Sequence, residues 1–265
     1  MGMMIGYGNP LFEPGVQVSG GFGGQNLANL VDGRPGTLAQ TNTVLNGTLF
    51  IAIWSRPIMP RIAAVINVSA PLGEKVDFLL KRAGDPSFTY ITRSTEVVET
   101  ATGDRCAFFV FEDGLDLCDG VAARFTDMQS PPDEPVLTCG QLWISEAAEY
   151  GLRPGFASGL TRSGEGVSVN GSLYTFPDSP RRTLDAEIVP QDYDSALLAQ
   201  DSLQSVAVAL SRDPRAVIIP DTDHIAATAR YCRVTELGPI TGLRNGPYFS
   251  MRLQAEEMVG NNGTI

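Results

Sequence analysis

The chain has 265 residues, a length that accommodates one or two compact domains with hydrophobic cores of their own. Its formal net charge is −11, from 30 acidic and 19 basic residues, which excludes a protein that holds nucleic acid or an anionic membrane by general electrostatic attraction. Charged residues make up only 18% of the chain and hydrophobic residues 43%, so it is globular rather than disordered, and its 28 Gly and 18 Pro indicate many turns between short strands.

No stretch of the sequence reaches the ~20 apolar residues that span a bilayer. The first residues, Met1–Gly6, lack the basic region and long apolar run of a secretory signal. We therefore expect a chain that is made and folds in a cytoplasm, without membrane insertion. No CxxC pair is present, so we expect buried reduced thiols rather than a zinc or redox site at the four cysteines, Cys106, Cys118, Cys139 and Cys232.

The first 24 residues are predicted to form an irregular, glycine-rich arm. The run Gly20–Gly24 contains too much glycine for regular structure, and the arm carries the aromatic residues Tyr7, Phe12 and Phe22. Aromatic side chains in an arm without a core of its own are stabilised by a groove on a neighbouring subunit or by stacking on sugar. The arm is thus a candidate interaction element, and removing residues 1–24 is expected to prevent assembly while leaving the rest folded.

Residues 25–150 are predicted to form a jelly-roll β-sandwich. Short apolar segments bounded by turn residues recur at regular spacing, as in sandwiches, and Trp54 and Trp143 lie inside two of them as expected core residues. The predicted strands cover residues 48–54, 61–69, 75–82, 88–92, 106–111, 121–128 and 136–144.

Residues 151–162 are rich in Gly and polar residues and are predicted to be a linker, followed at 163–258 by a smaller α+β domain and at 259–265 by a flexible C-terminus. Asn170-Gly171 between alternating flanks predicts a hairpin, and the apolar spacing from about Asp194 to Arg212 predicts a helix that ends before Pro214. Further strands are predicted at 184–188, 216–219, 230–237 and 248–257. The fold class is therefore mainly β, with one helix covering an antiparallel sheet in the second part.

No motif for catalysis, a metal or a cofactor emerges, and we predict no catalytic, cofactor-binding or metal-binding residues. The single histidine, His224, follows Asp221 and Asp223 in a segment that favours a helix start with Asp as N-cap over a metal ligand. A glycan hydrolase would need two carboxylates in one cleft with pKa values pushed apart. Acidic pairs occur, with surface and turn roles expected for most, at Glu112-Asp113, Asp116 with Asp119, Asp133-Glu134 and Glu256-Glu257.

Two segments resemble known families. The pattern Asn-Leu, then Asp-Gly and a following Thr, over Asn26–Thr37 resembles the opening of discoidin-like, galactose-binding-type jelly-roll domains. The second half is similar to C-terminal domains of minor tail proteins of tailed bacteriophages, through the order of Arg181–Leu184, an amphipathic helix, Ala216–Asp221, Arg230–Val234 and Tyr248–Glu257.

The combination resembles a distal tail, tail-tip or baseplate protein of a long-tailed phage or a gene-transfer-agent-like particle. This resemblance implies a non-enzymatic protein of the virion tail, assembled in the host cytoplasm as a ring of copies of itself that joins the tail tube to hub, tape measure or fibres. Two alternatives stay open: a carbohydrate-binding adhesin module that recognises host surface glycan, which exposed aromatic side chains converging in one concave site would favour, and a glycan hydrolase.

Overall fold

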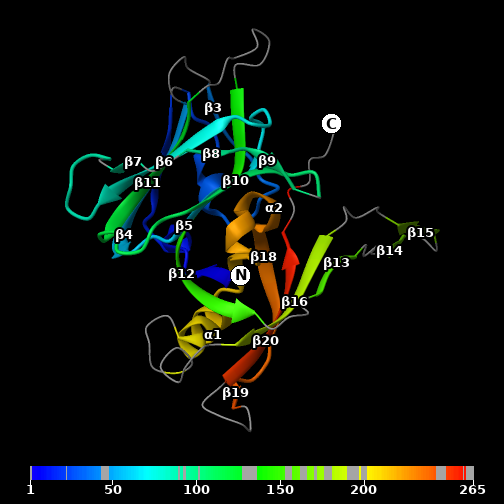
Figure 1. Cartoon of the computed structure of the whole chain (residues 1–265). Helices are drawn as coiled ribbons and strands as arrows, with labels where there is room; N and C mark the ends of the chain where they lie inside the picture. Colours follow the sequence, from blue (N-terminus) through cyan, green and yellow to red (C-terminus); the bar gives the residue numbers. More distant parts are fainter. Residues whose placement is uncertain are drawn as a thin grey trace.

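The computed structural model describes residues 2–21, 23–42, 48–88, 90–91, 94–100, 102–126, 136–152, 157–161, 166–169, 172–175, 181–189, 197, 202–242, 249–258 and 260. The chain builds two large antiparallel sheets, one of six strands and one of twelve (Figure 1). No helix among these residues is long and apolar enough to cross a membrane.

The first part of the chain is a β-sandwich. One layer is the six-stranded sheet, made of β2 (Gln17–Gly20), β4 (Thr48–Ile58), β11 (Cys118–Phe125), β6 (Lys75–Arg82), β7 (Tyr90–Ile91) and β8 (Thr95–Glu96). The facing layer is one end of the twelve-stranded sheet, made of β3 (Ala39–Asn42), the first half of β12 (Val136–Leu152), β5 (Ile62–Val68), β10 (Arg105–Val110) and β9 (Val98–Glu99).

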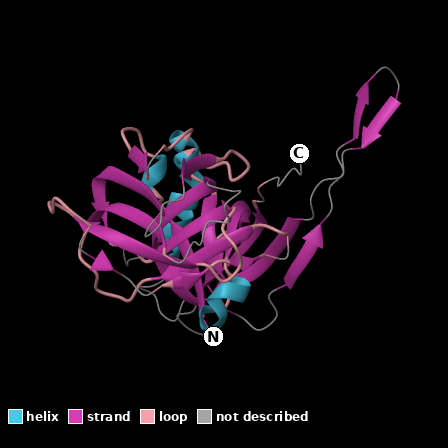
Figure 2. Ribbon diagram, turned by 90° about the horizontal axis from the view of Figure 1, so that it is seen from above, coloured by secondary structure: helices cyan, strands magenta, loops and turns pink. Residues whose placement is uncertain are grey.

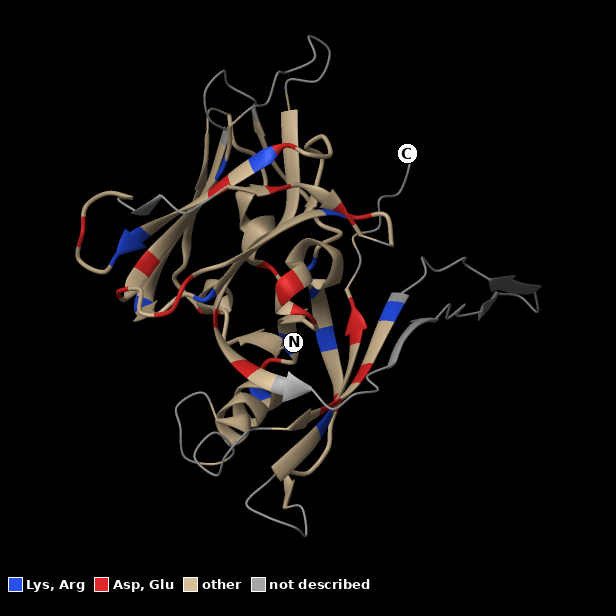
Figure 3. Ribbon diagram, viewed as in Figure 1, with Lys and Arg blue, Asp and Glu red and all other residues tan. Residues whose placement is uncertain are grey.

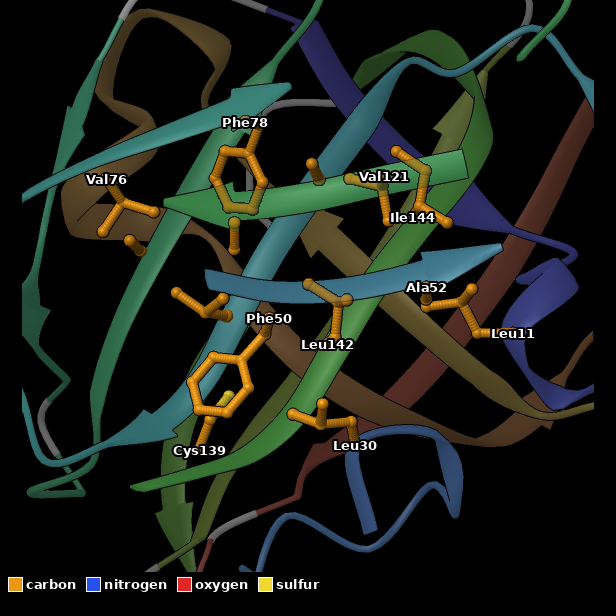
Figure 4. Close-up of a cluster of buried hydrophobic side chains, with 14 of the residues drawn as sticks. Leu11, Leu30, Phe50, Ala52, Val76, Phe78, Val121, Cys139, Leu142 and Ile144 are labelled. Atoms are coloured by element: carbon orange, nitrogen blue, oxygen red, sulfur yellow. The ribbon is translucent and has the colours of Figure 1, made fainter. Parts of the chain in front are cut away.

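The core of the sandwich lies between these layers. Phe50 and Phe78 from the six-stranded sheet and Leu142 and Ile144 from β12 are all fully buried (Figure 4). Leu11 and Leu30 belong to the same cluster and come from two short 3₁₀ helices, Pro10–Phe12 and Leu27–Val31. The sheets are therefore held together by apolar side chains that alternate along each strand.

Strand β12 runs on past the sandwich into a second unit. There the twelve-stranded sheet continues through β1 (Gly2–Tyr7), β17 (Arg215–Ile219), β18 (Arg230–Leu237), β20 (Phe249–Glu257), β16 (Arg181–Val189) and β13 (Ala157–Thr161), with β19 (Thr241–Gly242) on β20. Helix α1 (Leu203–Arg212) packs on this sheet through Leu203, Val206 and Leu210 (Figures 1 and 2). The short helix α2 (Ile225–Thr228) follows β17.

The predicted fold class is confirmed: the structure is mainly β, with a sandwich followed by an antiparallel sheet that carries a helix. Each predicted strand of the sandwich overlaps an observed one, and Trp54 and Trp143 are 3% and 0% exposed. The hairpin predicted around Asn170-Gly171 forms as β14 (Gly166–Val169) and β15 (Ser172–Thr175). Of the predicted helix, Leu197 is described in π-helical conformation, and α1 begins at Leu203 with Ser202 as N-cap and ends at Arg212.

The prediction of an irregular arm at residues 1–24 is wrong for most of that segment. Gly2–Tyr7 is strand β1, paired with β12 on one side and β17 on the other. Met3 and Ile5 are fully buried, and Tyr7 is 7% exposed. Phe12 packs edge-on against Trp143 with ring centroids 5.7 Å apart, while Phe22 lies outside the described residues. Strand β1 is central in the sheet because it lies between β12 and β17, two strands that are distant from it in the sequence.

The predicted linker at 151–162 is also strand where it is described. Gly151 and Leu152 end β12, and Ala157–Thr161 form β13. Of the C-terminus predicted to be flexible, the described Gly260 donates its backbone N–H to Asp104 Oδ2 at 2.7 Å. Strand β12, which belongs to both the sandwich and the second unit, thus joins the two units directly.

A third apolar cluster fills the junction between the units. Ile62 and Trp143 from the sandwich side pack with Met4, Val217 and Tyr231 from the second unit, all at most 3% exposed. The rings of Trp143 and Tyr231 contact each other in a tilted arrangement, with their centroids 5.4 Å apart and their planes at 59°. This burial fixes the two units relative to each other, since apolar area is removed from water on both sides.

Candidate functional site

A cavity of about 850 Å³ opens where the sandwich, the end of β1 and helix α1 meet. We call it the inter-unit cavity. Its lining combines aromatic, amide and charged side chains: Tyr7, Gly8, Asn9, Phe12, Glu13, Asp32, Gly33, Arg34, Arg56, Glu146, Ala209, Arg212, Asp213, Pro214, Arg215, Arg233 and Met258. Its volume is in the range of small-ligand sites.

The sandwich wall of this cavity is a loop that buried amides hold in place. Gln141 in β12 is fully buried; its Oε1 accepts from Gly33 N at 2.9 Å, and its Nε2 donates to Leu30 O at 2.6 Å. Asn67 Nδ2 donates to Pro35 O at 2.7 Å. A loop fixed through its backbone presents its side chains in a set geometry, which lowers the entropic cost of binding.

The motif over Asn26–Thr37 that carries the discoidin-like resemblance builds this loop. Asp32 Oδ1 accepts from Arg34 N at 2.7 Å, and Asp32 Oδ2 accepts from Thr37 Oγ1 at 2.6 Å. Asp32 therefore acts as a turn-forming residue that closes the loop on itself.

Arg215 ties the second unit to this loop. Asp213 holds its guanidinium through two hydrogen bonds, Nε–Oδ1 at 2.7 Å and Nη2–Oδ2 at 2.9 Å. The guanidinium lies 3.6 Å from the ring centroid of Phe12, a cation–π contact. It also packs against Gly33, whose φ of +76° and lack of a Cβ permit the approach.

The charged side chains of the cavity are only partly paired. Arg56 contacts Glu13 at 3.1 Å, and Arg215 is held by Asp213. Among the described residues, Arg34, Arg212 and Arg233 have no ion pair or side-chain hydrogen bond. With Asp32 and Glu146 also on the lining, the cavity has an excess of one positive charge, whereas acidic and basic residues are interspersed over the molecule as a whole (Figure 3).

Asn9 is a buried polar residue of the cavity wall with an unused donor. It is 5% exposed, and its Oδ1 accepts from Leu11 N at 3.0 Å. Its Nδ2 has no acceptor among the described residues. A buried donor without a partner costs about 1–3 kcal/mol, so such groups mark positions where an acceptor is expected.

The aromatic residues do not form an open stacking platform. Tyr7 is 7% exposed, and Arg215 covers one face of Phe12. The expectation that a sugar site would show exposed aromatic side chains converging in one concave place is not met in this cavity.

The other residues singled out from the sequence lie away from it. The four cysteines are buried and free, as predicted, and burial raises the pKa of Cys118 to about 11 and that of Cys139 to about 12. His224 is exposed and its Nδ1 lies 2.9 Å from Asp221 Oδ2, while Asp221 caps Asp223 N as predicted. The hydrogen bond from His224 lowers the pKa of Asp221.

Three of the acidic residues weighed for hydrolysis form ion pairs with basic side chains. Asp113 pairs with Arg61, Asp116 with Arg82 and Asp119 with Lys81. Asp133 and Glu134 lie outside the described residues. Within the described part of the chain, no group of three or more His, Cys, Asp or Glu is placed to hold a metal ion.

Glu257, of the predicted acidic pair Glu256-Glu257, and Asp104 are buried at the junction of the units. Asp104 is 4% exposed, and burial raises its pKa to about 6, against the hydrogen bond from Gly260 N. Burial also raises the pKa of Glu257, opposed by Arg182 and Arg230, and the charge of Asp104 adds to the increase. Neither residue lines the three cavities described for this structure.

Asp104 should make stability depend on pH. Native Asp104 keeps its proton up to a pH of about 6, whereas the unfolded chain releases it near 3.8, so its ionisation lowers stability as the pH rises through this window. In Asp104→Asn this loss disappears, while the side-chain oxygen still accepts from Gly260 N. The melting temperatures of the wild type and the variant should be similar at pH 4, and that of the variant should be higher at pH 7. A difference that does not change with pH would contradict this.

No protein-family model and no curated protein matches the chain. Part of the chain is similar to the F5/8 type C domain of a Bacteroides fragilis protein, with 14% identity and a TM-score of 0.40 over 50% of this chain and 91% of that one. It is also similar to a chitosan-binding module of a chitosanase/glucanase from Paenibacillus sp. IK-5, with 13% identity and a TM-score of 0.39 over 53% of this chain and 100% of that one.

A further similar structure is the family 32 CBM of C. perfringens NanJ in complex with galactose, with 10% identity and a TM-score of 0.40 over 55% of this chain and 100% of that one. These likenesses concern about half of this chain, and the assignment of a β-sandwich rests on the two sheets and their buried core.

Proposed function

We propose that this protein is a non-catalytic, glycan-recognising protein that binds its ligand in the inter-unit cavity. The observation that carries the proposal is the cavity itself: about 850 Å³, walled by a loop that Gln141 and Asn67 hold rigidly, and lined by polar groups with unused hydrogen-bonding capacity. Recognition of a sugar relies on such fixed donors and acceptors around a concave site.

The test is a screen of the full chain on a glycan array, followed by calorimetry with each oligosaccharide that binds. Helix α1 offers a matched pair of variants. Ala209 lines the cavity, whereas its neighbour Val208 is 46% exposed and does not. We expect Ala209→Trp to fill the site and abolish binding, and Val208→Trp to bind as the wild type does. Melting curves of both variants serve as the control that each is folded. Absence of binding to every glycan, or equal binding by both variants, would contradict the proposal.

A second candidate is a structural protein of a phage tail tip, located in the virion and acting through ring assembly with copies of itself and other tail proteins. What supports it is the hairpin β14–β15, which pairs with no other described strand and projects from the body (Figure 2). An isolated two-stranded hairpin is marginally stable in water, so a partner surface would stabilise it. Negative-stain electron microscopy at micromolar concentration should then show closed rings, and monomers alone would count against this role.

A further inference from the structure

The inter-unit cavity differs in charge from the rest of the molecule. The chain has a net charge of −11, yet five arginines and four carboxylates line this cavity. Two of the carboxylates, Glu13 and Asp213, form ion pairs with Arg56 and Arg215. The remaining lining charges are those of Arg34, Arg212 and Arg233 against Asp32 and Glu146, an excess of one positive charge. An acidic protein that gathers cations around one concave site attracts anions to that site.

Arg233, like Arg212, is an arginine of the second unit that lines the cavity and forms no ion pair among the described residues. It lies directly opposite Arg215 on the neighbouring strand, and both residues line the cavity. Like charges in opposite positions of two strands are destabilising. Asp213 neutralises Arg215 through two hydrogen bonds. On its other side Arg233 lies opposite Glu256 of β20, but among the described residues it forms no ion pair with that carboxylate. An anion in the cavity would remove this repulsion.

Arg34 supplies a cation from the sandwich wall. Its backbone is fixed by Asp32, and the flanking Gly33 and Pro35 are held by Gln141 and Asn67. Its side chain is exposed, and it has no partner among the described residues. A guanidinium on a rigid loop binds a carboxylate or sulfate through two parallel hydrogen bonds with little loss of entropy.

The neutral part of the lining favours the same kind of ligand. Asn9 Nδ2 is a buried donor that lacks an acceptor, and an anionic oxygen is a strong one. Arg215 covers a face of Phe12, so stacking of a neutral sugar on that face is blocked. Affinity must then come from charged and hydrogen-bonding groups.

We infer that the ligand of the inter-unit cavity is a saccharide with an oxyanion group, which Arg34 of the sandwich and Arg233 of the second unit bind together. This inference rests on the proposed function, because it names the class of glycan. The oxyanion is a carboxylate, as in uronic acids, or a sulfate. Since the two arginines belong to different units, the site exists only where the units meet.

The test is calorimetry of the full chain with three probes: an oligogalacturonate, a heparin-derived oligosaccharide and a neutral galactose-based oligosaccharide of equal length. We expect binding of an acidic probe, weakened about tenfold or more by Arg34→Gln and by Arg233→Gln, because each removes a charge-assisted hydrogen bond. Arg82→Gln is the matched control, since Arg82 contacts Asp116 on the sandwich surface away from the cavity. Raising the NaCl concentration should weaken acidic binding further.

The outcomes separate this inference from the proposed function. Preference for oligogalacturonate identifies a carboxylate, and preference for heparin identifies a sulfate. Binding of the neutral probe alone, unchanged in both arginine variants and in salt, would overturn the inference and leave glycan recognition intact. Binding of an acidic probe that Arg82→Gln weakens equally would overturn the assigned site. If none of the three probes binds and no glycan on the array binds, both the inference and the proposed glycan recognition are overturned.

Discussion

Replacing Ile5 by aspartate is expected to lower the free energy of unfolding by about 3–5 kcal/mol, because it places an unpaired charge in an apolar interior. Ile5 is fully buried at the centre of β1, between Ala148 of β12 and Ile218 of β17. The substitution should therefore separate the second unit from the sandwich sheet. Chemical denaturation followed by circular dichroism measures the effect.

The matched control is Ile5→Val, which keeps the strand and removes one methylene, at a cost of about 1 kcal/mol. A truncation lacking residues 1–8 should behave like the aspartate variant, since it removes the whole of β1. An irregular assembly arm would instead leave folding unchanged in both. Equal stability of the wild type and the aspartate variant would mean that β1 is not part of the fold in solution.

Gly140→Ala, in the strand against which the loop of the cavity wall packs, is expected to lower both the stability of the protein and its affinity for the ligand. A Cβ at this position in β12 would lie 2.1 Å from Pro35 O and 2.8 Å from Pro35 C, both backbone atoms that cannot rotate away. The loop that carries Arg34 must shift, and the hydrogen bond from Asn67 to Pro35 O is lost with it. We expect a loss of about 3 kcal/mol in stability and weaker binding of the acidic saccharide.

Gly242→Ala provides the control, because its Cβ would meet only Phe249 Cε1 at 3.8 Å, an ordinary contact. The variant places an alanine in strand β19, and its free energy of unfolding should stay within about 0.5 kcal/mol of that of the wild type. Denaturation curves and calorimetry on the two variants compare them directly. If both glycine variants behave alike, the loop at Pro35 adapts freely and does not fix the geometry of the cavity.

Local patterns were sufficient for most strands. The predicted segment 75–82 is β6 to the residue, and 230–237 is β18, because their apolar runs are bounded by Gly, Pro or Asp that stop a strand. The helix face was also predictable, since Val206 and Leu210 follow helical spacing and Pro214 limits the C-terminus. Such signals are contained within the segment that forms the element.

Strand β1 could not be placed in this way, because its partners are distant. Its residues 2–7 pair with 146–151 and 217–219, and no feature of Gly2–Tyr7 itself points to those segments. The apolar run Met3–Ile5 was a usable signal for a buried strand, but the surrounding glycines outweighed it. Tertiary pairing decided the outcome over local composition.

The cavity could not be predicted from the sequence either, because its lining residues are distant from one another along the chain. Its arginines occur at positions 34, 56, 212, 215 and 233, and no spacing in the sequence links them. Only the order of the strands places Arg34 of the sandwich and Arg233 of the second unit on the lining of one cavity. The turn residues Asp32 and Gly33 were recognisable as a bend, which was the one local signal at the site.

The position of β1 sets the order in which the molecule can be completed during synthesis. Its six residues are synthesised before either partner strand, and the second partner strand, β17, ends at Ile219. At a translation rate of about 5–20 residues per second, β1 waits roughly 10–40 seconds for that partner. Throughout this interval Met3, Met4 and Ile5 form an unpaired apolar segment on a nascent chain, which is the kind of sequence that chaperones hold. Strand β1 is thus made well before the two strands between which it lies in the folded sheet.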